Sequence, residues 1–194
     1  MNAIARLLLT LPVRRNSPPP KSVRNHIRQT VEALEDRTTP SRPLPYPVIA
    51  VGSGENTPAT VRLFDAESGQ LSFERSVFEA GFTGGVNVGA ADFTGDGYPD
   101  LLVSPGSGGG PRIRVLDGKS GEQLSGPIGD FLAYGGDFRG GVRVAAADLD
   151  GDARADVLAG SGAGGGSRVT AYRGETAGLT FDALPGFAGG VFVG

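Results

Sequence analysis

The sequence predicts an all-β fold made of four-stranded antiparallel β-propeller blades, preceded by a basic N-terminal segment. Three observations indicate this fold. Part of the chain repeats itself at an interval of 56 residues, each repeat holds four short apolar stretches, and glycine is abundant throughout the repeats. Four strands in a repeat of roughly 50 residues are typical of a propeller blade. A complete propeller has about four to eight blades, so the few repeats present here predict an incomplete one.

The first 45 residues differ in charge from the rest of the chain. Residues 1–45 carry eight Lys and Arg against three Asp and Glu, a net charge of +5, whereas residues 46–194 carry ten against eighteen, a net charge of −8. A basic segment before an acidic body favours targeting or anchoring. We therefore divide the chain into a basic targeting or linker segment, residues 1–45, expected to be largely disordered, and a repeat domain, residues 46–194.

One helix is expected inside the basic segment. Apolar residues fall on one helical face between residues 22 and 37, and Ser22 is placed to cap the N-terminus. The apolar run Leu7 to Leu9 is far too short to span a membrane. The sequence therefore predicts no transmembrane segment.

The composition of the chain excludes several functions. There is no cysteine, so disulfides, thiolate metal sites and a cysteine nucleophile are all absent. His26 is the only histidine and precedes the repeats, so the repeat domain has no Ser-His-Asp triad. The acidic repeat domain also argues against a nucleic-acid partner. We expect a protein that is not an enzyme.

The repeat is clearest between residues 84–118 and residues 140–174. Without a gap, 17 of these 35 aligned positions are identical, and residues 187–193 begin a third copy. Alternation of apolar residues predicts strands near residues 86–91, 100–104, 112–117 and 129–134. All 33 glycines lie at or after Gly52, as expected for short strands joined by tight turns.

An earlier, partial copy opens the repeat domain. Residues 48–54 correspond to the strand that follows an acidic loop, and residues 61–65 correspond to residues 113–117. No acidic loop precedes Val48. The first unit is therefore expected to begin in the middle of a repeat.

Two acidic loops, residues 92–100 and 148–156, are candidate metal sites. Each has aspartate at its first, fifth and ninth positions: Asp92, Asp96 and Asp100 in one loop, and Asp148, Asp152 and Asp156 in the other. The third position is Thr94 or Asp150. Oxygens at alternate positions of a tight turn converge on one point, and Ca²⁺ takes six to eight oxygen ligands. We expect Ca²⁺ as the cofactor.

These loops do not match the helical calcium loop of EF-hands. That loop ends in a bidentate glutamate at position 12, where this chain has Val103 and Ala159. An acid–base pair of carboxylates is an alternative interpretation, but the spacing favours metal ligation. The glycine runs 108–110 and 164–166 lack the Lys-Ser/Thr of a phosphate-binding loop.

Residues 84–103 and 140–159, with their shared glycines, alanines and aspartates, resemble the FG-GAP/VCBS repeats of integrin-alpha-type β-propellers. The resemblance covers residues 46–194. Carried over by position, it implies that each loop binds one Ca²⁺ through four side chains and one backbone carbonyl. The implied ligands are Asp92, Thr94, Asp96, Asp100 and the carbonyl of Tyr98 in the first loop, and Asp148, Asp150, Asp152, Asp156 and the carbonyl of Arg154 in the second. Ala153 stands where a glycine is usual.

A second resemblance lies in the basic segment. Residues 31–41 resemble a motif near the N-terminus of many large bacterial surface and secreted proteins. Together the two resemblances imply a calcium-stabilised, non-catalytic module of a protein that is extracellular or in the cell envelope, used for ligand binding or adhesion. The alternative is the scaffold portion of a larger extracellular polysaccharide-degrading enzyme whose catalytic domain lies outside this chain.

The partner implied by this function is an extracellular protein or polysaccharide. Exposed residues such as Arg112, Arg139, Arg143 and Tyr172 are candidate contacts, although each is more commonly a solvated strand residue. Open blade edges also favour self-association, because an unpaired strand edge readily accepts another strand.

Overall fold

The structure, a computed structural model, describes residues 46–194 and confirms the predicted all-β fold. The expected helix over residues 22–37 and the surface-protein motif over residues 31–41 lie outside the described residues. Eleven strands and one short 3₁₀ helix, η2 (Pro127–Gly129), are present in the described part. The strands are β1 (Val48–Gly52), β2 (Thr60–Asp65), β3 (Leu71–Ser76), β4 (Val86–Ala91), β5 (Asp100–Pro105), β6 (Arg112–Leu116), β7 (Asp130–Leu132), β8 (Val142–Ala147), β9 (Asp156–Ser161), β10 (Arg168–Arg173) and β11 (Thr176–Asp182).

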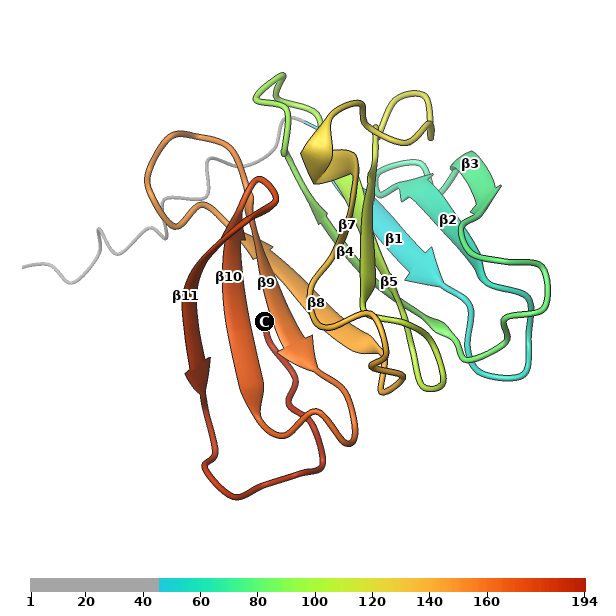
Figure 1. The fold of residues 1–194 in the computed structure, drawn as a ribbon. Coiled ribbons are helices and arrows are strands. Elements are labelled where there is room, and N and C mark those ends of the chain that lie inside the picture. Colours follow the sequence, from blue (N-terminus) through green and yellow to red (C-terminus); the bar gives the residue numbers. More distant parts are fainter. Residues whose placement is uncertain (1–45) are drawn as a thin grey trace, which may run out of the picture. The chain divides into compact units, whose positions relative to one another are not determined.

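The strands form three antiparallel sheets, which we call blade 1 (β1–β3), blade 2 (β4–β7) and blade 3 (β8–β11) (Figure 1). Within each blade the strands are hydrogen-bonded in chain order. The four strands predicted around the first acidic loop correspond to β4, β5, β6 and β7. The first three agree within about one residue. β7 is shorter than predicted at both ends, since Gly129 belongs to η2 and the strand ends at Leu132.

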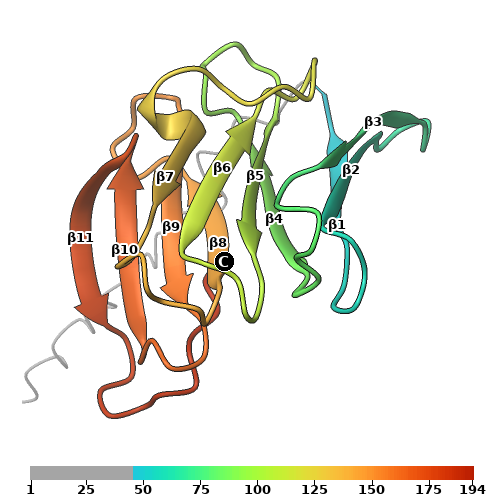
Figure 2. The same ribbon diagram turned by 45° about the vertical axis from the view of Figure 1, so that its right-hand side comes forward.

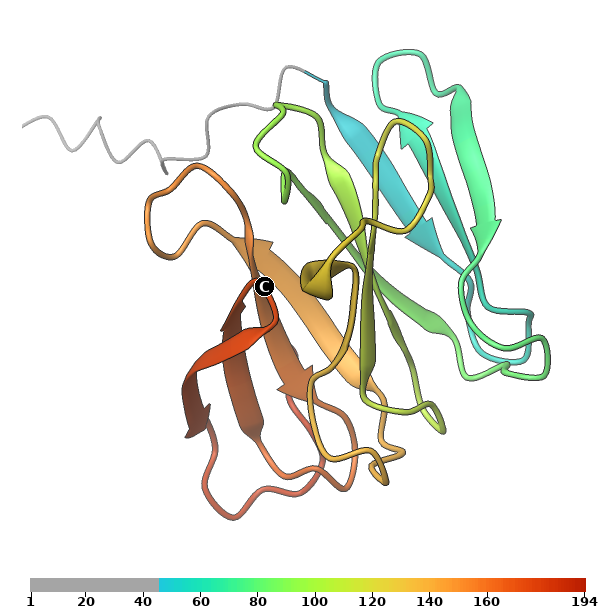
Figure 3. The same cartoon turned by 45° about the horizontal axis from the view of Figure 1, so that its top comes forward.

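The three blades lie side by side within the described part of the chain, as the turned view shows (Figure 2). The first strand of each complete blade, β4 or β8, is the innermost one, and β4 lies between β1 and β8 (Figure 3). This arrangement of neighbouring sheets is that of consecutive propeller blades.

An apolar core fills each of the two junctions between neighbouring blades. One cluster lies between blades 1 and 2 and includes the buried residues Val61, Leu63, Phe73, Leu101 and Val103. The other lies between blades 2 and 3 and includes Ile113, Val115, Val142, Val157 and Tyr172. Each core is therefore built from facing sides of two sheets, so one blade alone could not bury its apolar residues.

The same backbone hydrogen bond recurs at each step from one blade to the next. A residue in the loop after β1, β5 or β9 donates its N–H to a backbone carbonyl of the segment that leads into the next blade. The pairs are Asn56 to Thr83 at 2.7 Å, Gly108 to Arg139 at 3.0 Å and Gly164 to Ala188 at 3.0 Å. All three donors have positive φ, which is uncommon for the non-glycine residue Asn56 (φ 65°). The third pair places residue 188 where a following blade would begin.

A polar turn joins β6 to the strand segment that follows it. The carboxylate of Asp117 accepts the N–H groups of Lys119 and Ser120, at 3.1 and 2.7 Å, and the hydroxyl of Ser120. Asp65 forms the same turn after β2. In blade 2 this turn holds Lys119 close to the first acidic loop. None of the helices in the described residues is long and apolar enough to cross a membrane.

Candidate metal centres

Each acidic loop is closed by its last aspartate. Asp100 accepts the N–H of Phe93 and Asp156 accepts the N–H of Leu149, both at 3.0 Å. Both aspartates are buried, and each begins the second strand of its blade. The strand therefore positions the ninth loop residue beside the first two.

The first aspartate of each loop organises the turn itself. In the first loop, the two carboxylate oxygens of Asp92 accept the N–H groups of Gly95 and Gly97, at 2.6 and 2.7 Å. In the second loop, Asp148 accepts the N–H groups of Gly151 and Ala153, at 2.7 and 3.0 Å. The turn is thus built from side chain to backbone bonds within each loop, which explains why the same residue types recur in both.

Ala153 adopts a backbone conformation that favours glycine. Its φ is 69°, and its counterpart Gly97 has a φ of 80°. A non-glycine residue in this left-handed region costs roughly 1–2 kcal/mol. The second turn therefore carries local strain that the first lacks.

We expect Ala153→Gly to stabilise the protein. The strain removed from the folded protein outweighs the extra conformational entropy that glycine gives the unfolded chain. The free energy of unfolding should therefore rise by about 0.5–1 kcal/mol. Urea unfolding followed by circular dichroism measures it, with Gly97→Ala in the first loop as the matched opposite change. A loss of stability in Ala153→Gly would contradict the strain that its φ implies.

The second loop brings three carboxylates together. Asp148, Asp150 and Asp156 each offer one oxygen, and these oxygens lie within 4.8 Å of one another. Only hard oxygen donors are present, as a Ca²⁺ site requires. Asp152 is not part of this group; its carboxylate accepts the N–H of Arg154 at 2.8 Å. The donor set of the second loop fits a bound calcium ion.

The first loop shows no such group of three acidic side chains. Asp96 forms a 2.6 Å ion pair with Lys119, which lowers the pKa of the Asp96 carboxyl, and it also accepts the N–H of Tyr98 at 2.8 Å. Thr94 donates its hydroxyl to Asp92 at 3.3 Å. These side chains satisfy one another within the protein, so the first loop fits a cation less well.

Asp100 is also fully engaged by protein donors. Besides Phe93, it accepts the N–H of Gly118 at 3.1 Å, and it is only 1% exposed. Burial raises the pKa of the Asp100 carboxyl to about 6. Burial also raises the pKa of Asp156. Without a cation, then, the ninth position of each loop resists ionisation.

Sequence patterns did not reveal the cations beside the loops. Lys119 contacts Asp96, and Arg173 lies 3.5 Å from Asp150. Both cations come from turns or strands about 23 residues further along the chain, and only the pairing of the strands within each blade brings them to the loops. Bound Ca²⁺ would compete with Arg173 for Asp150.

The two loops also touch each other. The N–H of Ala155 donates to the carbonyl of Asp92 at 2.7 Å. A Cβ atom on Gly95 would lie 3.1 Å from Nε of Arg154. The acidic loops of blades 2 and 3 are therefore in direct contact.

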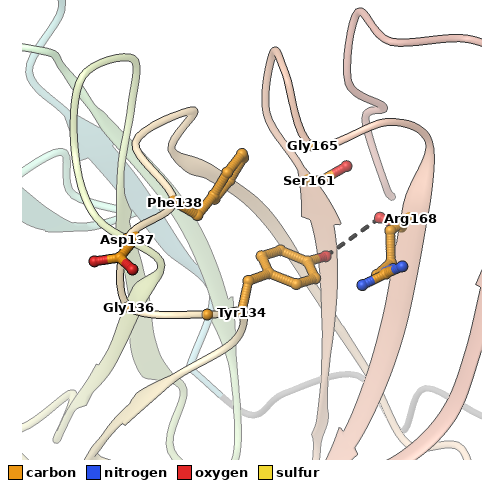
Figure 4. A pocket seen from close by; sticks show the side chains of 8 residues that line it. Tyr134, Gly136, Asp137, Phe138, Ser161, Gly165 and Arg168 are labelled. Carbon is orange, nitrogen blue, oxygen red and sulfur yellow. Dashed lines mark hydrogen bonds between the residues drawn. The ribbon is translucent and has the colours of Figure 1, made fainter.

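Two shallow hollows lie at corresponding places on the blade junctions. The one between blades 2 and 3, with a volume of about 280 Å³, is lined by Tyr134, Phe138, Ser161, Gly165 and Arg168, among others (Figure 4). Each hollow contains an edge-to-face aromatic pair, Tyr134 with Phe138 or Phe78 with Phe82. Tyr134 donates its hydroxyl to the carbonyl of Ala159, so the polar end of this ring is already used.

One expected contact residue proves to be buried. Tyr172 was predicted to be an exposed candidate contact, but it is only 5% exposed and donates its hydroxyl to the carbonyl of Ala133. Its ring packs 5.0 Å from that of Phe131, centroid to centroid. Tyr172 is therefore part of the core between blades 2 and 3, and the prediction was wrong.

The family comparison agrees with the first part of the repeat. Residues 84–116, which span β4, the first acidic loop, β5 and β6, match the FG-GAP repeat family. No curated protein and no solved structure matches the chain. The match to the FG-GAP repeat thus lies within blade 2, one of three neighbouring β-propeller blades.

Proposed function

We propose that this chain is a calcium-stabilised, non-catalytic β-propeller module of a bacterial secreted or cell-surface protein, used for ligand binding or adhesion. The observation that carries the calcium assignment is the convergence of Asp148, Asp150 and Asp156 in the second loop. The FG-GAP match supports a repeat module that binds rather than catalyses. The lack of histidine in residues 46–194 agrees with this role.

Calcium would act on this module as a structural ion. Asp148 and Asp156 already hold the two ends of the second loop together, and Asp150 lies in the same group. A cation supplies the positive charge that offsets the repulsion between three neighbouring carboxylates. Weak calcium sites are typical of extracellular modules, where calcium is abundant, and this supports an extracellular or cell-envelope location.

The ligand class that we propose is an extracellular protein or polysaccharide. The hollows at the blade junctions offer aromatic rings beside exposed polar groups, such as Arg168 next to Tyr134 (Figure 4). Such surfaces at the junctions of rigid elements are common binding sites.

Thermal unfolding in calcium and in excess chelator tests the proposal. If calcium is present at about ten times its dissociation constant, binding adds about 1.4 kcal/mol per site. That corresponds to a rise of roughly 3–6 °C in the melting temperature of a domain of this size. Asp150→Asn should abolish the rise, because it removes a ligand charge but keeps the shape of the side chain.

The matched control is Asp137→Asn, which removes an exposed carboxylate that lies outside both acidic loops. This variant should keep the full response to calcium. A melting temperature that does not change with calcium in the parent protein would overturn the calcium assignment. A response that survives in Asp150→Asn would place the ion elsewhere.

A further inference from the structure

Among residues 46–194, blade 1 has no counterpart of the innermost strand that the other two blades have. In blade 1, Ile49 pairs with Phe64 and Val51 with Arg62. These pairs match those between β5 and β6 in blade 2, where Leu101 pairs with Leu116 and Val103 with Arg114. β1 is therefore the second strand of a blade, and no described strand pairs with its other edge.

Residues 187–194 supply an innermost strand to which no other described strand of the same blade is paired. Residues 187–193 repeat the sequence pattern that leads into β4 and β8. Val191 donates its N–H to Ser161 of blade 3 at 2.9 Å, just as Val86 of β4 donates to Ser53 of blade 1 at 2.9 Å. Among the described residues, no second strand pairs with residues 191–194 on the opposite edge.

Gly54 marks the place where such a strand would pass. Its counterparts Gly106 and Gly162 are confined, because an added Cβ would lie 2.2 Å from the carbonyl oxygen of Gly84 or 1.8 Å from that of Gly140. At Gly54, no described atom lies within 4 Å of an added Cβ, and its φ is not in the left-handed region. Within one chain, nothing described requires glycine there.

The backbone N–H groups of Gly106 and Gly162 also have partners that the N–H of Gly54 would find only in an added strand. Gly106 donates to the carbonyl of Gly85 at 2.9 Å and Gly162 to that of Gly141 at 3.0 Å. Both bonds join the loop after the second strand to the start of the innermost strand of the same blade. The corresponding acceptor for Gly54 is the carbonyl of Gly190, by the same alignment of repeats.

The outer faces of blades 1 and 3 are apolar where they should contact another blade. Ile49 and Val51 are 50% and 43% exposed, whereas Leu101 and Val103, at the same positions in blade 2, are fully buried against blade 1. On blade 3, Phe181 is 47% exposed. Its counterpart Phe131 packs against the next blade.

We propose that a second copy of this chain completes blade 1. Residues 187–194 of one copy add to the free edge of β1 in the other, antiparallel, with Val191 opposite Ser53 and Val193 opposite Val51. The outer face of blade 3 then covers Ile49 and Val51. The described residues of each copy form three blades, so two copies joined head to tail at both ends form six, within the range of about four to eight found in closed propellers.

The same chain cannot make this contact with itself. Residues 187–191 are held against blade 3, and blade 2 lies between blade 3 and blade 1, with a separate core on each side. The open edge and the free strand therefore meet only between molecules. This inference rests on the blade architecture and not on calcium, so it and the proposed function can fail separately.

Sedimentation equilibrium of the full chain over a wide range of concentration tests the proposal. The parent protein should form a dimer. Gly54→Ile should be monomeric, because its side chain would occupy the path of the added strand, while its circular dichroism spectrum stays unchanged. The control Gly135→Ile, at another glycine with open space around it, should remain dimeric.

A mixing experiment gives a second, independent outcome. A chain that ends at Gly186 keeps the free edge of β1, and Gly54→Ile keeps residues 187–194. Each should be monomeric alone, and together they should form a 1:1 complex through the single intact junction. If Gly54→Ile fails to fold, Val51→Lys takes its place, because Val51 is exposed in one chain and covered in the dimer. A monomeric parent, a dimer that survives either substitution, or the absence of the 1:1 complex would overturn the proposal.

Discussion

Leu101→Ala is expected to destabilise the protein by about 3–5 kcal/mol, the upper part of the range for a large-to-small change in a well-packed core. Leu101 lies in the middle of blade 2 on β5 and is fully buried. Its side chain belongs to the core that joins blade 2 to blade 1. The lost contacts leave a cavity between two sheets that are fixed by their own hydrogen bonds, so the site has little freedom to collapse.

Ile49→Ala is the matched control, because Ile49 holds the same place in blade 1. Its side chain is half exposed in the single chain, so the expected loss is below about 1 kcal/mol. Urea unfolding at low protein concentration measures both variants without a contribution from association. Equal losses would mean that another segment of the same chain already covers β1.

Asp100→Ala is expected to cost about 2–5 kcal/mol at about pH 5, because it leaves two buried N–H groups without an acceptor at roughly 1–3 kcal/mol each. These donors are the N–H groups of Phe93 and Gly118. Together they tie the first acidic loop to the turn after β6. Loss of the carboxylate therefore loosens two loops at once.

The pH dependence of this loss identifies Asp100 as its source. Burial raises the pKa of Asp100 from 3.8 to about 6 in the folded protein. Between these values the folded state holds a proton that the unfolded state releases, so the stability from this group is present at low pH and is lost as the pH rises through 6. Without metal, Asp100 should therefore add about 1.5 kcal/mol to the stability of the parent protein as the pH falls from about 7.5 to 5.

The Asp100→Ala variant should lack the contribution of Asp100 and keep only the smaller gain from Asp156, whose pKa burial also raises. Chelator must be present, because a cation would favour the ionised carboxylate. Asp130→Asn is the control: Asp130 pairs with Arg112, and its pKa is lowered, so its stabilising contribution is lost only below about pH 4. A gain between pH 7.5 and 5 that is as large in Asp100→Ala as in the parent protein would assign the proton to another group.

Much of the fold could be predicted because its signals are local. Alternating apolar residues predicted β4 and β6, and the continuous apolar stretch after the first acidic loop predicted β5. The correspondence of β1 with β5 was also visible in the repeat, and the strand pairs confirm it. β7 was predicted too long: Gly129 belongs to the short helix η2, and the strand ends at Leu132 although apolar residues continue beyond it.

The candidate metal ligands were only partly separable by sequence. From their spacing in the sequence, Asp96 and Asp152 were predicted to be metal ligands like the other aspartates of the loops. In the structure, Asp96 is held by Lys119 and Asp152 bonds to the backbone of its own loop. Tyr172 was misjudged in a similar way, because an aromatic residue near a strand end gives no local sign of whether another sheet covers it.

By itself, the sequence determined the repeating strands, the glycine turns and the positions of the acidic loops, since each depends on residues within a few positions of one another. Only the tertiary structure decided which carboxylates converge and which apolar faces are covered. Asp148, Asp150 and Asp156 meet because a turn and a strand bring them together. Leu101 and Ile49 are equivalent in sequence, but Leu101 has a blade against it and Ile49 has none among the described residues. Contacts between sheets are made by residues far apart in the chain, so no local sequence pattern predicts them.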